Sequence, residues 1–333
     1  MQLPKRAIFA FNANLDHICN VSDDAMVAIE RFSPALHAQM DECFAWGIGR
    51  EAAIDAKACE FLLSNVRFDR EMVGGQAGNA AQTASALGVE CYLHANFPSS
   101  RLLEAFSYPQ RVMLASEKGF VSADGFPSQA KSAHHFVFEN RGNNTRFIAS
   151  YDPVPLHLDS DFCRHIDAVL PNVGHAFVGG FHLLQSTDRL GKFAEELARW
   201  KKINSKLRIF CELGDFQSKA VQEAVRERIF PLCDMVGLSD VELSSLGCPL
   251  EELAEEVPLL FHAPGKQAAL PREREDAAAL SFARKCASFL AEKGRHGTLA
   301  EVEAHEGGFV ERPAQIVGLG DAFSCAYFLA SKR

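Results

Sequence analysis

A turn near the end of the chain combines two glycines with an acidic residue. Gly318 and Gly320 flank Leu319, and Asp321 follows directly, at the start of a run of good helix formers that reaches Ala330. Glycine lets backbone approach a ligand closely, and the first N–H groups of a helix have no partner within it, so this turn can bind an anion. A carboxylate beside such a site suits a base that deprotonates an attacking hydroxyl. Alternatively, Asp321 only caps the helix.

Two glutamates at the ends of predicted strands can serve a metal ion. Glu212 follows the apolar run 207–211, and Glu242 follows the run 233–238. Together with an anion-binding turn they suit phosphoryl transfer, because Mg²⁺ is steered by a few carboxylates and by the phosphates of the nucleotide. Taken singly, each glutamate can instead be a charge at a helix N-terminus.

Strand and helix signals alternate through most of the chain. Short apolar runs such as 7–11, 89–95 and 175–180 are typical of buried strands, and helical patterns lie between them. Repeated β-then-α units predict an α/β fold with a mostly parallel sheet flanked by helices on both faces. Polar residues that follow the strands then share one edge of the sheet. This set is Asn14, Asp16, Gly75, Gly180, His182, Glu212, Glu242 and the turn before Asp321.

The stretch from about 102 to 151 has a different pattern. Its strand-like segments at 111–114, 135–139 and 146–149 are separated by turns rich in Gly, Ser and Asn, without a helical period. This pattern predicts a small β-rich lid on the main body, or alternatively a plain hairpin excursion.

Composition limits the classes of partner and compartment. With 333 residues and 47% hydrophobic residues, the chain can form one large and one smaller domain. A net charge of −9 without a basic run argues against nucleic acid or an anionic membrane as a partner. The first residues are neither a signal peptide nor a membrane span, so we expect a cytoplasmic protein. Ten scattered cysteines without a CxxC pair indicate neither zinc nor a disulfide framework.

Two common nucleotide-binding motifs are missing from the sequence. No GxGxxG follows the first predicted strand, and GxxxxGK[ST] does not occur anywhere. Neither a Rossmann dinucleotide site nor a P-loop is therefore supported, and the phosphate site must be of another kind.

Three motifs, in this order, resemble the ADP-dependent phosphofructokinase and glucokinase family of the ribokinase-like kinases. They are GGQAG at 74–78, GFHLL at 180–184 and VGLGD at 317–321. Asn12–Asp16 resembles the first-strand sugar motif of that family, and Val236–Leu243 resembles its GLNxxE segment. The resemblance spans the first strand to the last helix, and GGQAG together with GLGD favours the ADP-dependent branch.

The resemblance implies an ADP-dependent kinase that phosphorylates glucose or fructose 6-phosphate with Mg²⁺ and releases AMP. Asp321 would be the base, and the catalytic turn, Gly318 to Asp321, would bind the moving phosphoryl group through the N–H groups of Leu319, Gly320 and Asp321. The implied sugar contacts are Asn14, Asp16, Gly74, Gly75, Gln76, Asn79 and His182. The implied nucleotide contacts are Ser239, His262, Gly318 and Gly320, and the implied metal residues are Glu212 and Glu242.

The implied large domain covers 1–16, 71–101 and 152–333, and the implied lid covers part of 17–70 together with 102–151. The partners would be a sugar and a nucleotide, and the protein would be a monomer or a homodimer.

Departures from the family pattern leave alternatives open. Ser239 stands where the NxxE motif has Asn, and Phe210 stands where the HxE motif has His. Asn79 resembles the GGxxxN of ribokinase. The alternatives are an ATP-dependent ribokinase-like carbohydrate or nucleoside kinase, and a sugar- or nucleotide-binding homologue that has lost turnover. Arg141 or Arg146 on the predicted lid is a candidate to contact a sugar phosphate, so the acceptor stays open.

Overall fold

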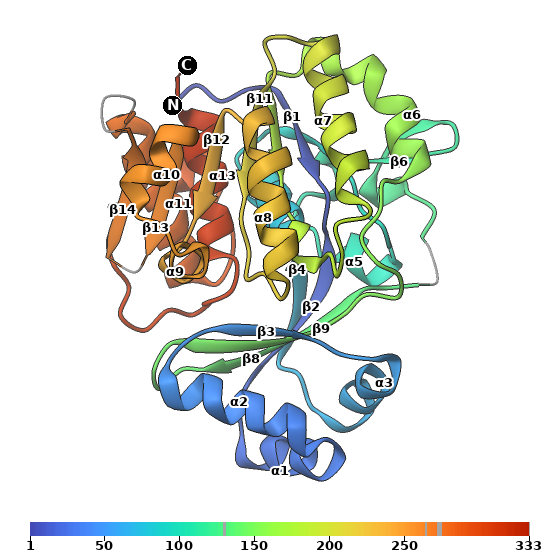
Figure 1. Ribbon diagram of the computed structural model, residues 1–333, viewed down its shortest axis with the longest axis vertical. Helices are drawn as coiled ribbons and strands as arrows, with labels where there is room; N and C mark the ends of the chain where they lie inside the picture. The colour runs from blue at the N-terminus through green and yellow to red at the C-terminus, as the bar shows by residue number, and fades with distance from the viewer. Residues whose placement is uncertain (129–130, 264, 272–274, 333) are drawn as a thin grey trace.

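A nine-stranded sheet forms the centre of the larger domain in the computed structural model, which describes residues 1–128, 131–263, 265–271 and 275–332 (Figure 1). The strand order is β14 (Lys266–Leu270), β13 (Leu259–Ala263), β12 (Met235–Leu238), β11 (Arg208–Glu212), β10 (His175–Val178), β1 (Arg6–Ala10), β5 (Glu90–Leu93), β6 (Val112–Ser116) and β7 (Gly119–Ser122). The edge strands β7 and β14 are antiparallel to their neighbours, and the strands between them are parallel. The prediction of a mostly parallel sheet is confirmed.

Both faces of this sheet are covered by helices, because its central strands are apolar on both sides. Along β1, Ala7 and Phe9 belong to one buried cluster, whereas Ile8 and Ala10 belong to the other. The first cluster includes α4 (Gln76–Ala86), α11 (Ala277–Lys293) and α13 (Leu319–Ala330). The second includes α6 (Ser160–Val169), α7 (Leu190–Ile203) and α8 (Lys219–Arg228).

A five-stranded sheet below the large domain forms the lid, which we define as residues 14–74 and 134–151 (Figure 1). Its strand order is β3 (Arg50–Ala53), β9 (Thr145–Tyr151), β8 (His134–Asn140), β2 (Asn14–Asn20) and β4 (Arg70–Gly74). The outer face buries Phe136, Phe138 and Phe147 under α1 (Asp23–Phe32), α2 (Pro34–Trp46) and α3 (Ala56–Asn65). The inner face buries Ile18 and Val137 against Val317 of the large domain.

The predicted boundaries between the domains are wrong in two places. Segment 102–122 lies in the large domain, because β6 pairs with β5 and β7 pairs with β6. Conversely, residues 14–16 and 71–74 belong to the paired lid strands β2 and β4. An apolar alternation identifies a strand but not the sheet that it joins, since pairing is decided by distant partners. The lid strand β3 lies between the helices α2 and α3 and has no strand signal in the sequence.

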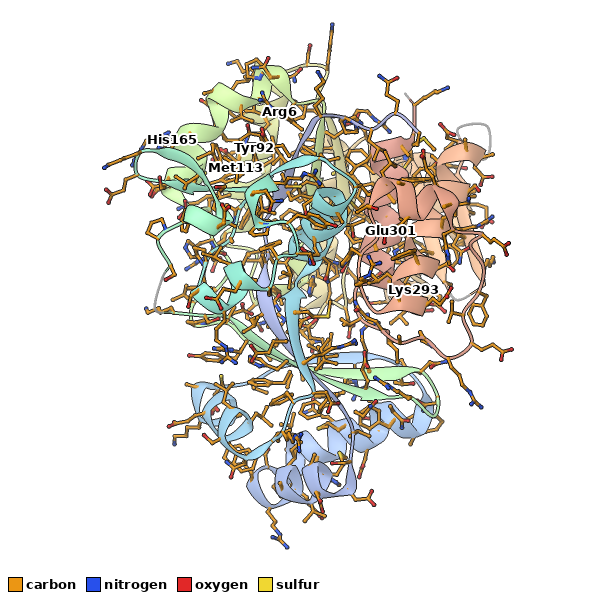
Figure 2. All side chains as sticks on the ribbon, turned by 180° about the vertical axis from the view of Figure 1, so that it is seen from behind. Arg6, Tyr92, Met113, His165, Lys293 and Glu301 are labelled. Atoms are coloured by element: carbon orange, nitrogen blue, oxygen red, sulfur yellow. The ribbon has the colours of Figure 1, made fainter. Side chains whose placement is uncertain are left out.

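The parallel strands point their carboxyl ends toward the lid. Arg6, the first residue of β1, lies at the end of the large domain remote from the lid, as Figure 2 shows from behind. The remaining helices are α5 (Ser100–Glu104), α9 (Asp240–Leu246), α10 (Leu250–Glu256) and α12 (Leu299–Ala304). Within the described ranges, no helix has the length and apolar character needed to cross a membrane.

Candidate functional site

A cavity of about 800 Å³ separates the lid from the carboxyl ends of the parallel strands. The lid contributes Asp16, Glu51, His135 and Arg146, and the large domain contributes Gly75, Gln76, Asn79, His182, Glu212, Ser239, Glu242, His262 and Gly318–Asp321. Asn14 and Gly74 lie beside Asp16, just behind this wall. The structure therefore gathers the predicted sugar, nucleotide and metal residues around one space.

The turn from Gly318 to Asp321 has the geometry that an anion site requires. Gly318 has φ +79° and precedes the first residue of α13, Leu319. The first hydrogen bond within α13 runs from the Ala322 N–H to the Gly318 carbonyl at 3.0 Å. The N–H groups of Leu319, Gly320 and Asp321 therefore have no carbonyl partner within the helix. A Cβ on Gly320 would lie 2.9 Å from Cε1 of His262, so this position needs glycine.

Asp321 lines the cavity, and its side chain has an unusual pKa. Its Oδ2 accepts a hydrogen bond from Asn79 Nδ2 at 2.9 Å. Burial, and secondarily the nearby Glu212 carboxylate, raise the pKa of Asp321 to about 7, although Asn79, Arg146 and His262 each lower it. Asp321 thus changes its protonation state near neutral pH, which is the range in which a general base works best.

Asn79, one of the predicted sugar contacts, has a second role in the structure. Its amide holds the Asp321 carboxylate, while its main-chain carbonyl accepts the Thr83 hydroxyl at 3.0 Å on α4. The Asn79 Oδ1 atom is buried without a hydrogen-bond partner among the described residues. Asn79 therefore orients Asp321 and keeps one acceptor atom for a ligand.

Asp16 lies at the start of the lid, on β2. Its Oδ1 accepts from Asn14 Nδ2 at 2.6 Å, and the residue is 3% exposed. Burial raises the pKa of Asp16 to about 6, against the opposing effects of His135 and Asn14. A Cβ on Gly74 would overlap this carboxylate, so the neighbouring strand β4 approaches it only because residue 74 is glycine.

Gln76 and Gly75 shape the floor of the cavity. Gln76 Oε1 accepts from the Gly180 N–H at 2.7 Å, and its Nε2 donates to the Leu213 carbonyl. The amide predicted to contact sugar thus ties together the ends of two strands. Gly75 precedes the first residue of α4 and has φ +75°, a backbone conformation that residues other than glycine rarely adopt.

Two lid residues that the sequence analysis does not single out face the same space. Glu51 lies 3.6 Å from His182 Nε2 and 3.9 Å from His135 Nδ1. Burial acts to raise the pKa of Glu51, but His182 and His135 outweigh it and hold the pKa at about 2. His135 also lies 3.3 Å from Asp152; burial opposes its charge, but Asp152, Glu51 and Asp16 raise its pKa to about 9. No signal marks Glu51, because its strand is four residues long and lies in a mostly helical segment.

Glu212 ends β11, and Glu242 lies in the first turn of α9, which follows β12. Glu212 Oε1 pairs with His262 Nε2 at 2.7 Å, and its buried Oε2 has no hydrogen-bond partner among the described residues. Glu242 forms a capping box with Ser239, in which the Ser239 N–H donates to Glu242 Oε2 at 2.5 Å. Burial raises the pKa of Glu242 to about 6. The alternative of a charge at a helix N-terminus therefore applies to Glu242, in the first turn of α9, but not to Glu212, the last residue of β11.

A magnesium ion fits this pair of glutamates only together with outside ligands. In the part of the chain that the structure describes, no three His, Cys, Asp or Glu side chains are grouped to hold a metal. The unpartnered Glu212 Oε2 and the second glutamate still supply what a hard cation needs from protein, because Mg²⁺ keeps several waters and takes further oxygens from a nucleotide.

The departure at Phe210 has a structural explanation. Phe210 stacks on Phe177 at 5.1 Å between ring centres and contacts Phe328 at 5.2 Å, inside the core of the large domain. The imidazole beside Glu212 comes instead from His262 on β13, whose pKa is raised to about 9 because Glu212 outweighs the effect of burial. Glu212 is thus paired without a histidine at position 210.

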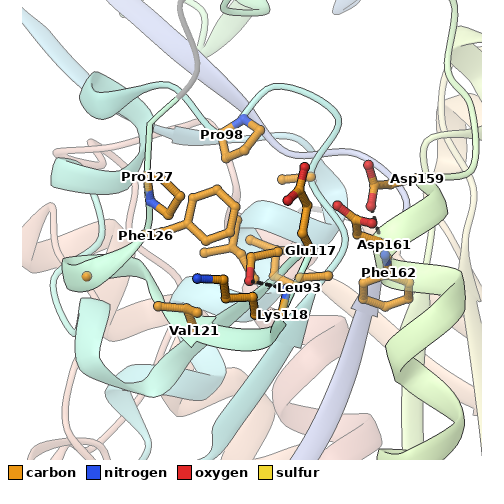
Figure 3. A pocket seen from close by; sticks show the side chains of 15 residues that line it. Leu93, Pro98, Glu117, Lys118, Val121, Phe126, Pro127, Asp159, Asp161 and Phe162 are labelled. Atoms are coloured by element: carbon orange, nitrogen blue, oxygen red, sulfur yellow. Dashed lines mark hydrogen bonds between the residues drawn. The ribbon is translucent and has the colours of Figure 1, made fainter.

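A second cavity of about 500 Å³ lies within the large domain (Figure 3). Leu93, Phe126 and Phe162 give it apolar walls, and its charged groups include Glu117 and Lys118 on the β6–β7 turn. None of the predicted site residues lines it, in contrast to the cavity between the lid and the large domain.

The family model described as the ADP-specific Phosphofructokinase/Glucokinase conserved region matches residues 5–270. The chain belongs to this family. Its members are phosphotransferases that use a sugar hydroxyl as acceptor. No curated protein matches the chain.

Solved structures with the same fold share little sequence with this chain. An ADP-dependent kinase in complex with fructose-6-phosphate and ADPbetaS has a TM-score of 0.82 at 18% identity, covering 98% of this chain and 93% of its own. A hypothetical ADP-dependent phosphofructokinase from Pyrococcus horikoshii OT3 has a TM-score of 0.75 at 18% identity, covering 98% of both chains. A probable sugar kinase from Rhizobium etli CFN 42 reaches 0.53 at 15% identity, covering 81% and 77%. The fold of this family member is thus ribokinase-like, as predicted.

Removal of the Asn79 amide should change the pH dependence of phosphoryl transfer. In Asn79→Ala the Asp321 carboxylate loses a hydrogen bond that stabilises its charged form, so its pKa should rise. We expect the acidic limb of the kcat/KM profile to move up by roughly one pH unit, the size of a lost hydrogen bond to a charged group. Gln82→Ala removes an amide from the same helix, bonded to Ser107, and should leave the limb in place. An unchanged limb in Asn79→Ala would contradict this role.

Substitution of Gly74 should displace the Asp16 carboxylate. Gly74→Ala places a methyl group where Asp16 lies, so we expect the free energy of unfolding to fall by about 1–3 kcal/mol and activity to fall with it. The same change at Gly191, on α7, meets nothing within 4 Å and should raise stability by about 0.5–1 kcal/mol. Urea unfolding of both variants distinguishes these outcomes, and equal effects would show that Gly74 has no special close contact.

Proposed function

We propose that this protein transfers a phosphoryl group from ADP to a hydroxyl of glucose or fructose 6-phosphate and releases AMP. The observation that carries the proposal is Asp321, a carboxylate with a pKa near 7 at the first turn of α13, beside free N–H groups and inside the cavity between the two domains. Membership of the ADP-specific phosphofructokinase and glucokinase family supports ADP as the donor. The similar structure with fructose-6-phosphate and ADPbetaS supports the same pair of ligands.

Asp321 acts as the general base in this mechanism. Above pH 7 its carboxylate is ionised and accepts the proton of the acceptor hydroxyl as that oxygen attacks the terminal phosphorus of ADP. The N–H groups of Leu319, Gly320 and Asp321 stabilise the charge on the transferred group. The His262 imidazolium, in close contact with Gly320, adds a positive charge on the nucleotide side.

The acceptor lies against the lid, held by Asp16 and Asn14, with Gly74, Gly75, Gln76, Asn79 and His182 around it. Asp16 is strongly selective in this position, because a ligand that lacks the expected hydroxyl leaves a buried carboxylate unsatisfied. The Glu51 Oε1 atom is buried, with His135 Nδ1 3.9 Å away and no hydrogen-bond partner among the described residues, which suits a further hydroxyl. Arg146 is exposed to the cavity and suits a sugar phosphate.

The donor lies on the other side of the catalytic turn, near Ser239 and His262. Glu212 and Glu242 would hold Mg²⁺, largely through its water ligands. When bound, the ion would neutralise charge on the phosphates of ADP. Glu212 is kept in place by the His262 ion pair, and Glu242 by the capping box with Ser239.

An assay that crosses donors with acceptors tests this proposal. With Mg²⁺ present, we expect turnover with ADP, release of AMP, and a clear preference for glucose or fructose 6-phosphate over other sugars and nucleosides. Arg146→Gln should raise KM for fructose 6-phosphate at least tenfold and leave KM for glucose nearly unchanged, because only the former carries a phosphate. Turnover with ATP alone would indicate the ribokinase-like alternative. Binding without turnover would indicate a homologue that has lost activity.

Substitution of the base should separate activity from stability. Asp321→Asn should lower kcat by about 10²–10⁴, because it removes the proton acceptor. The raised pKa means that ionised Asp321 destabilises the folded state, a cost that grows from pH 4 to pH 7 and is constant above. We therefore expect the variant to be more stable than the wild type by about 1–3 kcal/mol at pH 8 and nearly equal to it at pH 4. Near-native turnover, or no pH-dependent difference in unfolding, would remove Asp321 from this role.

A further inference from the structure

The segment 311–317, which leads into the catalytic turn, is held by the lid along its length. Asn144 Nδ2, at the tip of the β8–β9 hairpin, donates to the Glu311 carbonyl at 3.1 Å. Arg70 Nη1, on β4, donates to the Ala314 carbonyl at 3.4 Å. Val317 packs in a buried cluster with Ile18 and Val137 of the lid sheet. The chain thus lies against the lid immediately before it reaches Gly318.

Glu139 makes the central contact of this segment. It lies on β8, its side chain is fully buried, and its Oε1 accepts the Ile316 N–H at 3.3 Å. Ile316 is two residues before Gly318, so a lid carboxylate holds the backbone that enters the catalytic turn. Burying a carboxylate costs free energy unless the carboxylate is paired. The presence of Glu139 at this position therefore indicates that it has a specific role.

The charges around Glu139 are close but not in hydrogen-bonding contact. Arg70 Nη2 lies 3.9 Å from Oε1, and Arg141 Nη2 lies 3.9 Å from Oε2. Glu139 Oε2 and Arg70 Nη2 are both buried without a hydrogen-bond partner among the described residues. An approach of roughly 1 Å would convert either pair into a charge-assisted hydrogen bond. The arrangement is therefore able to tighten if the lid moves slightly against the segment.

The same lid strand carries an acceptor-side residue. His135 lies four residues before Glu139 on β8, and it is in register with Asp16 on β2. A ligand that binds Asp16 and His135 therefore fixes the strand that holds Ile316. The catalytic turn follows within two residues, so its N–H groups and Asp321 move with the same backbone.

We propose that Glu139 is a positioning residue that couples occupation of the acceptor site to the placement of the catalytic turn. This inference rests on the proposed function, since it assigns the acceptor to the lid side of the cavity. Acceptor binding draws the lid onto segment 311–317, the Arg70 and Arg141 contacts to Glu139 shorten, and the Ile316 amide is held where Gly318–Asp321 meet the transferred phosphoryl group. Nucleotide binding then becomes tighter in the presence of acceptor, because the turn contacts both ligands.

The test compares Glu139→Ala and Glu139→Gln with the wild type. Calorimetry measures the Kd of a non-hydrolysable ADP analogue with Mg²⁺, with and without saturating glucose or fructose 6-phosphate. We expect acceptor to tighten nucleotide binding at least fivefold in the wild type and less than twofold in Glu139→Ala. Turnover should fall 10- to 100-fold in kcat with less than threefold change in acceptor KM, because a turn misplaced by about 1 Å loses its alignment. Glu139→Gln keeps an acceptor oxygen for Ile316 and should lie between the two.

Glu60→Ala, on the exposed side of α3, is the matched control for loss of a lid carboxylate and should behave as wild type. A merely structural role would lower the melting temperature of Glu139→Ala while the ratio of nucleotide Kd values stayed at the wild-type value, and this result would overturn the proposal.

Hydrogen exchange separates failure of this inference from failure of the proposed function. Without any ligand, the amide of Ile316 should exchange at least tenfold faster in Glu139→Ala than in the wild type, and that of Ile29 in the lid core should not change. Faster exchange in a protein that shows no turnover would support the Glu139 contact while the proposed function fails. Unchanged exchange at Ile316 would overturn the inference even if the enzyme is active.

Discussion

Buried carboxylates at the boundary of the two domains are the constraint on which the site depends. Placing a charge in a low-dielectric cavity is costly, so each such group needs a partner that does not also occupy the ligand position. Asn14 donates a hydrogen bond to Asp16, and Asn79 donates one to Asp321. His262 forms an ion pair with Glu212. Glu51 forms ion pairs with His182 of the large domain and with His135 of the lid. These partners explain much of the polar composition around the cavity.

The same constraint links the two domains. Glu51 reaches His182 across the cavity, and the buried Glu139 reaches the Ile316 amide. Each of these lid carboxylates has a partner in the large domain, His182 or the Ile316 amide, that the lid by itself does not supply. A cavity with charged groups on both walls can also be closed around a polar ligand, which excludes water and strengthens the electrostatic contacts inside it.

The residues that depart from the family motifs each have an identifiable contact in the fold. Phe210 joins an aromatic core, and its absent imidazole is replaced by His262 beside Glu212. Ser239 caps α9 and, through the capping box, fixes Glu242. Asn79 orients the Asp321 carboxylate as well as facing the cavity. In each case the changed residue has a partner in the fold, so these positions are not simply degraded motifs.

Some features of this protein follow from the sequence alone. Helix starts such as Gly318–Asp321 and glycine turns such as Gly74–Gly75 are local, because they depend on backbone conformation and on the few residues that follow. The alternation of strands and helices predicts the parallel sheet and the edge where the motifs meet. The family resemblance carried by these motifs is confirmed by the family that matches residues 5–270.

Only the tertiary structure decided which sheet each strand joins and which partners the buried charges have. Strand 112–116 belongs to the large sheet and strand 50–53 to the lid, although neither local pattern indicates it. The contacts of Glu51 with His182 and of Glu139 with Ile316 join residues more than a hundred positions apart. Such pairings are determined by register and by packing between domains, and a sequence pattern that spans a few residues does not contain that information.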